Sequence, residues 1–199
     1  MDLKDKLVYF SKLIWDRKLT ESIGGNFSIR DKSKVLITPT TFLKKFIEKN
    51  DIVTIDLDGE ILEGERKPSS EWRMHTLIYK VRSDVGSIIH AHPPYATLYA
   101  IKGEEIPVFL TPESQIYLKN IFYADYATPG TEEFARKILP GLERGSEIFI
   151  LKNHGVTVID RTIEMAYAKL EMLEFVCMIG SMLNNPTNYY VIDKNLEGI

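Results

Sequence analysis

The chain has 199 residues, of which 44% are hydrophobic and 27% are charged, and its formal net charge is −3. This length suits one domain with a sizeable core, which we expect to span residues 1–199, and the acidic balance without a basic, aromatic-rich stripe argues against a nucleic-acid partner. Since the sequence has no signal-peptide pattern and no apolar run of membrane-spanning length, we expect a cytoplasmic protein without a membrane partner.

The first third of the chain predicts one helix followed by a meander of short strands. Apolar residues at helical spacing, with Asp2 as a possible cap, predict a helix over residues 2–19. The glycines of IGGN end this helix, and alternating or apolar runs follow them. The predicted strands are residues 23–30, 34–39 and 51–56, with an Asp58-Gly59 turn leading into Ile61-Leu62.

The rest of the chain interleaves helices with strands. We predict helices over 70–82, 95–101, 131–139 and 161–183, and strands over 86–92, 106–110 and 147–160, the last being two strands joined at residues 153–155. Thr131 is a suitable cap for its helix, and Cys177 fits the core of the last helix better than a reactive thiol. Because short turns join many of the strands, we predict one α/β domain with a mainly antiparallel sheet flanked by helices.

Two of the four histidines, His90 and His92, stand one residue apart in the stretch IIHAHPP. Side chains at positions i and i+2 of a strand share a face, so both imidazoles can reach one ion while Ala91 turns away. Imidazole nitrogens suit zinc, which takes three protein ligands in catalytic sites, and His154 in the turn NHG offers a third. The alternative, that each is a hydrogen-bonded structural residue at a strand end, stays open from the pattern alone.

The stretch KPSSEWRMH predicts a loop that enters a helix. The free amide groups of a helix N-terminus, together with the hydroxyls of Ser69 and Ser70, suit a phosphate group. Ser70 can instead be the N-cap, although Arg73 leaves the capping box incomplete, and Glu71 has a simpler explanation as an acidic residue in the first turn. His75 shares a helix face with Glu71, and we expect it to pack or to support the site rather than to bind the metal.

Two further loops can contribute to the same anion site. Gly24-Gly25-Asn26 is a flexible turn with a side-chain amide donor, and Thr38-Pro39-Thr40-Thr41 is a loop rich in hydroxyl groups. Each of these patterns is common in turns and loops. Neither resembles a P-loop or a dinucleotide-binding fingerprint.

Taken in order, GGN, ITPT, KPSSEWRMH, IIHAHPP and KNHGV resemble the class II aldolase/adducin family, in particular its fuculose-phosphate aldolase type, from about Ser22 to about Leu183. The resemblance implies a central antiparallel sheet with helices on both sides, and a homotetramer with active sites at subunit interfaces. It implies that His90, His92 and His154 bind one Zn²⁺ per chain and that Glu71 is the catalytic carboxylate, which also approaches the metal. The phosphate-binding positions it implies are Gly25, Asn26, Thr40, Thr41, Ser69 and Ser70, with Thr41 standing where the fuculose type usually has glycine.

The implied reaction is the reversible cleavage of a ketose-1-phosphate to dihydroxyacetone phosphate and a short aldehyde such as lactaldehyde. The metal would stabilise an enediolate, and Glu71 would remove the proton alpha to the carbonyl. Thr111 stands near the position at which fuculose-type enzymes have a tyrosine that helps to protonate the aldehyde oxygen. The possible replacements for that tyrosine are Glu113, Tyr117, Tyr123 and Tyr126. A second, C-terminal tyrosine of the family could be replaced by Tyr189 or Tyr190.

Other outcomes of the same chemistry stay open within the family. A methylthioribulose-1-phosphate type dehydratase or a decarboxylase would share the enediolate, whereas epimerase relatives tend to have aspartate where Glu71 stands. A non-catalytic, adducin-like binding module is disfavoured because the three histidines and the carboxylate are all present.

Overall fold

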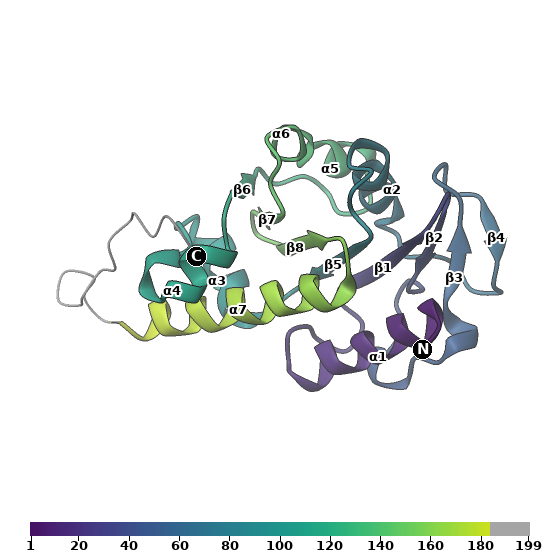
Figure 1. Cartoon of the computed structure of the whole chain (residues 1–199), viewed down its shortest axis with the longest axis horizontal. Helices are drawn as coiled ribbons and strands as arrows, with labels where there is room; N and C mark the ends of the chain where they lie inside the picture. Colours follow the sequence, from purple (N-terminus) through teal and green to yellow (C-terminus); the bar gives the residue numbers. More distant parts are fainter. Residues whose placement is uncertain (184–199) are drawn as a thin grey trace.

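The computed structural model describes residues 1–183, which form one eight-stranded sheet with helices on both faces (Figure 1). The sheet order is β4-β3-β2-β1-β5-β8-β7-β6. The strands are β1 (Asn26–Asp31), β2 (Lys34–Ile37), β3 (Val53–Ile55), β4 (Ile61–Glu63), β5 (Ser87–Ala91), β6 (Ile121–Ala124), β7 (Ile148–Leu151) and β8 (Gly155–Asp160). Six of the seven pairings are antiparallel, and only β6 and β7 are parallel, which confirms the mainly antiparallel sheet.

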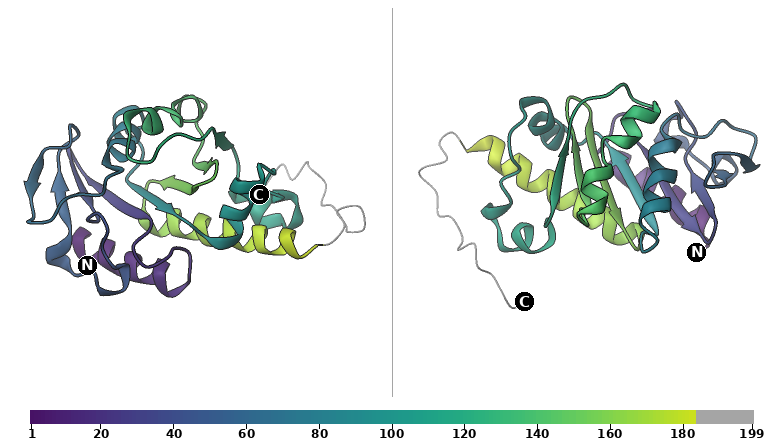
Figure 2. Two further views of the ribbon diagram at one scale, coloured as in Figure 1. Left: turned by 180° about the vertical axis from the view of Figure 1, so that it is seen from behind. Right: turned by 90° about the horizontal axis from the view of Figure 1, so that it is seen from above.

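Seven α-helices and three short 3₁₀ helices connect the described strands. The α-helices are α1 (Leu3–Asp16), α2 (Trp72–Val81), α3 (Pro94–Lys102), α4 (Pro112–Tyr117), α5 (Glu132–Arg136), α6 (Leu139–Glu143) and α7 (Ile163–Met182), and the 3₁₀ helices are η1 (Lys44–Phe46), η2 (Lys49–Asp51) and η3 (Val108–Leu110). Helices α1, α3 and α7 pack on one face of the sheet, whereas α2, α5 and α6 pack on the other. The view from behind shows α7 and α2 on opposite sides of the sheet (Figure 2).

The alternation of side chains along the strands explains the two apolar layers. In β5, Ile89 and Ala91 join the layer beneath α7, whereas Ile88 joins the layer beneath α2. His90 therefore faces the side of the sheet that α2 covers. Helix α7 packs against the layer that contains Ile89 and Ala91 and buries Cys177 there, as the sequence predicts.

Side-chain caps start several helices where the sequence predicts them. Asp2 accepts from the backbone N–H of Asp5, and Thr131 accepts from that of Phe134. The alternative role of Ser70 as N-cap is not found, because Glu71 is the N-cap residue of α2 and its own N–H donates to the hydroxyl of Ser69 at 3.2 Å.

Two predicted elements differ from the structure, and two were missed. Residues 106–110 are not a strand: Pro107 lacks an N–H for a sheet ladder, and the 3₁₀ helix η3 follows it. The helix predicted over 131–139 ends early, as α5, because Pro140 has no N–H to donate to a carbonyl of the preceding turn; a second helix, α6, begins at Leu139 and continues past the predicted end. Among the α-helices and strands, the sequence analysis missed α4 and β6.

Candidate metal and substrate site

The three histidines meet at one end of the central strands. His90 is the fourth residue of β5, His92 follows the same strand, and His154 lies on the turn between β7 and β8. One nitrogen from each ring lies within 4.8 Å of the others. The ring centroids of neighbouring pairs are 4.7 to 5.0 Å apart. The pairing of β5 with β8 thus brings His154 next to His90 and His92, although more than sixty residues separate it from His90 in the sequence.

Hydrogen bonds orient two of the imidazoles toward each other. The Nδ1 atom of His90 lies 3.0 Å from the carbonyl oxygen of Val156, which can only accept, so that Nδ1 carries the proton. The Nδ1 atom of His92 lies 3.0 Å from the carboxylate of Glu21 and has the same role. In both rings the Nε2 atom is then left with a lone pair, and the two Nε2 atoms are 3.2 Å apart.

This arrangement fits a divalent cation. Two lone pairs at 3.2 Å repel each other unless a proton or a cation lies between them or beside them. Burial, and then the neighbouring imidazoles, hold the pKa of His90 well below its usual value, and burial lowers that of His154 to about 4. Neutral imidazoles are the form that binds metal, so the donor set of His90, His92 and His154 suits zinc or a similar ion.

Glu71 places a buried carboxylate against this cluster. Its Oε2 atom is 3.2 Å from Nε2 of His90, and its Oε1 atom is 3.6 Å from Nε2 of His154. The side-chain amide of Asn26 donates to Oε2 at 3.0 Å. Burial raises the pKa of Glu71, while the bond from Asn26 opposes that shift. A cation bound by the histidines would favour the ionised carboxylate further, so Glu71 can serve both as a ligand and as a base.

Behind Asn26 lies a buried polar chain that includes the fourth histidine. Nε2 of His75 lies 2.6 Å from Oδ1 of Asn26, and Nδ1 of His75 lies 2.6 Å from the hydroxyl of Ser28. The hydroxyl of Tyr79 lies 2.8 Å from that of Ser28. Both ring nitrogens of His75 are thus occupied by Asn26 and Ser28, and among the described residues the convergent cluster is His90, His92 and His154, which agrees with the expectation that His75 supports the site and does not bind the ion.

The predicted phosphate-binding residues line one small cavity beside the metal cluster. This cavity has a volume of about 140 Å³ and includes Glu71, His90 and His92 in its wall. All six predicted phosphate positions line it as well: Gly25, Asn26, Thr40, Thr41, Ser69 and Ser70. The structure therefore brings the anion loops and the metal cluster into one site.

Backbone contacts explain how the separate loops reach this cavity. The N–H of Ser69 donates to the carbonyl of Thr38 at 3.1 Å, and the N–H of Thr40 donates to that of Lys67 at 3.1 Å. Gly25 has φ +66°, and a Cβ there would lie 2.7 Å from the carbonyl oxygen of His90, so a glycine is required at this close approach. Thr41 also has positive φ, at 49°, in the left-handed region that favours glycine, the residue that the family resemblance leads us to expect at this place.

The described residues that were considered as proton donors to the aldehyde oxygen do not line this cavity. Thr111 caps α4, where its hydroxyl accepts from the N–H of Ser114. The hydroxyl of Tyr123 accepts from the N–H of Ile106 at 2.8 Å, and the half-exposed Tyr117 and Tyr126 do not line the cavity. Glu113 lies in the first turn of α4. The two remaining candidates, Tyr189 and Tyr190, lie outside the described residues.

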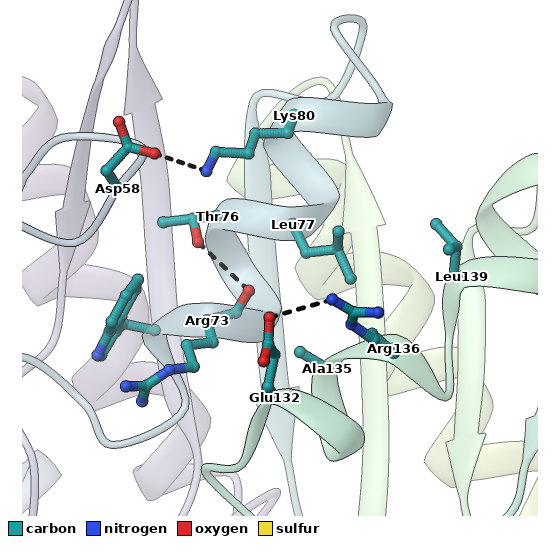
Figure 3. Close-up of a pocket in the computed structure, with 10 residues that line it drawn as sticks. Asp58, Arg73, Thr76, Leu77, Lys80, Glu132, Ala135, Arg136 and Leu139 are labelled. Carbon is teal, nitrogen blue, oxygen red and sulfur yellow. Dashed lines mark hydrogen bonds and ion pairs between the residues drawn. The ribbon is translucent and has the colours of Figure 1, made fainter.

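A larger cavity of about 330 Å³ lies between α2 and α5 and is a weaker candidate (Figure 3). Its cationic side chains already have partners: Lys80 pairs with Asp58 at 2.8 Å, and Arg136 pairs with Glu132 at 3.2 Å. It has no histidine in its wall. The cavity beside the histidines is therefore the site that combines metal ligands, a buried carboxylate and free donors.

Two residues near the site had not been anticipated from the sequence. Glu21 orients His92, and Lys44 is buried behind the anion loops. Neither lies in a recognisable motif. Glu21 could have been suspected only from the glycine turn that follows it, and Lys44 belongs to a Lys-Lys pair of the kind usually found on a surface.

The chain matches known proteins along most of its length. Residues 5–180 match the family described as Class II Aldolase and Adducin N-terminal domain. A Methanococcus maripaludis protein named L-fuculose phosphate aldolase is 38% identical over 173 residues, which are 87% of this chain and 93% of that protein. A Bacillus thuringiensis protein named 5-deoxy-D-ribulose 1-phosphate aldolase is 34% identical over 184 residues, covering 88% of this chain and 83% of that protein. A solved structure described as L-fuculose 1-phosphate aldolase has a TM-score of 0.87 and 35% identity, covering 96% of this chain and 90% of that one.

The chain belongs to the class II aldolase and adducin family. Within that family it is an enzyme, a class II, metal-dependent aldehyde-lyase. The family resemblance of the sequence motifs is thereby confirmed. None of the helices in the described part of the chain is both long enough and apolar enough to span a membrane.

Proposed function

We propose that this chain is a zinc-dependent aldolase that reversibly cleaves a ketose-1-phosphate of the L-fuculose-1-phosphate type. The products would be dihydroxyacetone phosphate and a short aldehyde such as lactaldehyde, formed through an enediolate. The observation that carries this proposal is the position of Glu71, whose buried carboxylate touches the histidine cluster and also lines the anion cavity. One carboxylate can then act on a substrate that is held by its phosphate and by the ion.

The histidines and Glu71 would hold the ion, which supplies a Lewis acid for the negative charge that develops on the substrate oxygens. In the condensation direction Glu71 takes the proton from the hydroxyl-bearing carbon alpha to the carbonyl of dihydroxyacetone phosphate, and Asn26 holds the carboxylate in place. In the cleavage direction the carbon–carbon bond breaks to leave the enediolate, which takes a proton from Glu71 at that carbon. The amides and hydroxyls of the anion loops bind the phosphate and thereby position that carbon beside Glu71.

The donor set supports zinc as the ion. Three imidazoles with one carboxylate nearby match the ligands and the open position of catalytic zinc sites. Manganese and magnesium would prefer sites richer in oxygen. Metal analysis of the purified protein, loaded in a mixture of divalent ions, tests this choice.

A second candidate substrate is a 5-deoxyribulose-1-phosphate. It is favoured by relatives named for that activity, including a Rhodospirillum rubrum protein that is 37% identical and covers 82% of this chain. The two substrates share the phosphorylated three-carbon half, which the site binds, and differ in the aldehyde half. Dehydratase, epimerase and decarboxylase activities of the same family share the enediolate as well.

Product analysis on a panel of ketose phosphates tests these possibilities. The panel includes L-fuculose-1-phosphate, 5-deoxyribulose-1-phosphate and methylthioribulose-1-phosphate, and the products scored are dihydroxyacetone phosphate, the aldehyde, dehydration products and CO₂. An aldolase releases dihydroxyacetone phosphate from at least one of them. Dehydration products or CO₂ without dihydroxyacetone phosphate would refute the aldolase proposal.

We also propose that the protein is a homotetramer, as the family resemblance implies, and that it is cytoplasmic, as the sequence analysis leads us to expect. In a tetramer with sites at subunit interfaces, a neighbouring subunit could supply the group that protonates the aldehyde oxygen. Sedimentation of the purified protein tests the tetramer, since a monomer with full activity would exclude any such contribution.

A further inference from the structure

Lys44 is a buried lysine that lies directly behind the anion cavity. Its side chain begins in η1, and only 1% of the residue is exposed. The ammonium group donates to the carbonyl of Ile23 at 3.2 Å and to that of Phe42 at 3.1 Å. Lys45, the next residue, is exposed and lies over the ring of Trp15, so the two lysines have different environments.

The two carbonyls belong to the two loops that form the wall of the cavity. Ile23 precedes Gly24 and Gly25 in the first loop, and Phe42 follows Thr40 and Thr41 in the second. The backbone N–H of Lys44 also donates to the carbonyl of Ser22 at 3.1 Å. Lys44 therefore holds both loops, and it is not itself among the residues that line the cavity.

The charge of this ammonium group has no close counter-charge among the described residues. Its hydrogen bonds there go to neutral carbonyls, and Glu21 attracts it only from beyond ion-pair distance. A buried charge without a partner is costly. The wall of the cavity itself contains neither lysine nor arginine, although a phosphate group brings up to two negative charges into it.

We propose that Lys44 is a positioning residue that supplies the positive charge for the substrate's phosphate through the loops it holds. This inference rests on the proposed function, because it takes the cavity to be the phosphate site. The negative charge of the bound phosphate offsets the positive charge of the buried Lys44 ammonium group. In turn, that ammonium group makes the cavity bind a dianion better than a neutral ligand.

The ionisation of Lys44 agrees with this role. Burial lowers the pKa of Lys44 to about 8, and the distant Glu21 opposes that shift. The side chain is therefore mostly charged at neutral pH. A dianion bound in the adjacent cavity would favour the charged form still more.

Titration calorimetry of the metal-loaded protein with inorganic phosphate tests the proposal. The variants are Lys44→Met, which removes both the charge and the hydrogen bonds, and Lys44→Gln, which keeps a donor for the loop carbonyls but no charge. Lys45→Met is the matched control, because it removes a charge from the exposed neighbour. Metal content and melting temperature are measured for each protein.

We expect both Lys44 variants to bind phosphate about tenfold more weakly than the parent, with an unchanged metal content, while Lys45→Met binds normally. In the aldolase assay, KM for the phosphorylated substrate should rise while kcat changes little. Parent-like affinity in Lys44→Gln would overturn the proposal, since the lysine would then only tether the loops. If Lys44→Met does not fold, the Gln variant alone decides.

The result also separates this inference from the proposed function. A parent protein that does not bind inorganic phosphate would count against the phosphate site as a whole. A parent that binds phosphate, with Lys44 variants that bind it equally well, would refute only the role of Lys44.

Discussion

Asn26 and Glu71 are joined by a 3.0 Å hydrogen bond, although 45 residues separate them in the sequence. The amide group of Asn26 donates to Glu71, so its oxygen must face Nε2 of His75, which therefore carries the proton. Nδ1 of His75 then accepts from Ser28, whose oxygen accepts from Tyr79. Every group in this buried chain thus has one orientation, and the chain fixes the carboxylate of Glu71.

The buried, neutral state of His75 predicts a pH dependence of stability. Burial lowers its pKa from 6.5 to about 3 in the folded protein, so below pH 6.5 the unfolded state binds a proton that the folded state does not. Stability is therefore lost as the pH falls from about 6.5 toward 3. Between pH 7 and pH 5 the parent should lose roughly 2 kcal/mol more than His75→Gln.

Urea unfolding of both proteins in the presence of a chelator checks this difference. The other histidines contribute equally to parent and variant, so the comparison isolates His75. Equal losses of stability in the two proteins would show that His75 is already protonated, or exposed, in the folded state.

The histidine cluster predicts the metal content of a variant. His92→Ala removes one of the three convergent nitrogens, so we expect the parent to hold about one divalent ion per chain and the variant to lose most of it. Mass spectrometry of the elements in dialysed protein measures the content. His75→Gln is the control and should keep its ion, and a fully loaded His92→Ala protein would place the ion elsewhere.

The position of Glu71 predicts a separation between binding and proton transfer. Glu71→Gln should keep most of the ion, which three histidines still hold, but should lose at least about 100-fold in the exchange of the alpha proton of dihydroxyacetone phosphate. Deuterium incorporation followed by nuclear magnetic resonance measures that exchange. The exposed Glu132, changed to Gln, serves as the control, and unimpaired exchange in Glu71→Gln would mean that another group is the base.

The contact between Glu21 and His92 predicts an effect on metal affinity. Glu21→Ala removes the acceptor that fixes the proton on Nδ1 of His92, so zinc should bind about tenfold more weakly. Glu21→Gln keeps a neutral acceptor and should lose less. Competition with a chromophoric chelator gives both affinities, and an unchanged affinity in Glu21→Ala would show that the backbone alone orients His92.

Most of the helices and strands could be predicted because their signals are local, whereas the roles proposed for the histidines, Glu71 and the anion loops came from the family resemblance. The apolar run before His90, the cap at Thr131 and the loop before Glu71 each carry their own pattern in sequence. Helix α4 and strand β6 are short and lie where the surrounding fold, rather than periodicity, decides the structure. Glu21 and Lys44 could not be assigned from sequence, because their roles depend on which distant groups the loops bring near them.

The position of β5 at the middle of the sheet has a consequence for folding. His90 lies opposite Asn26 on β1 and opposite Thr157 on β8. A shift of β5 by one residue would turn Ala91 toward α2 and send His90 into the opposite apolar layer. Such a chain would offer no set of three nitrogens, so an ion would be retained only by chains whose strands have paired correctly. Metal binding would therefore stabilise the correctly paired sheet and no sheet with a shifted β5.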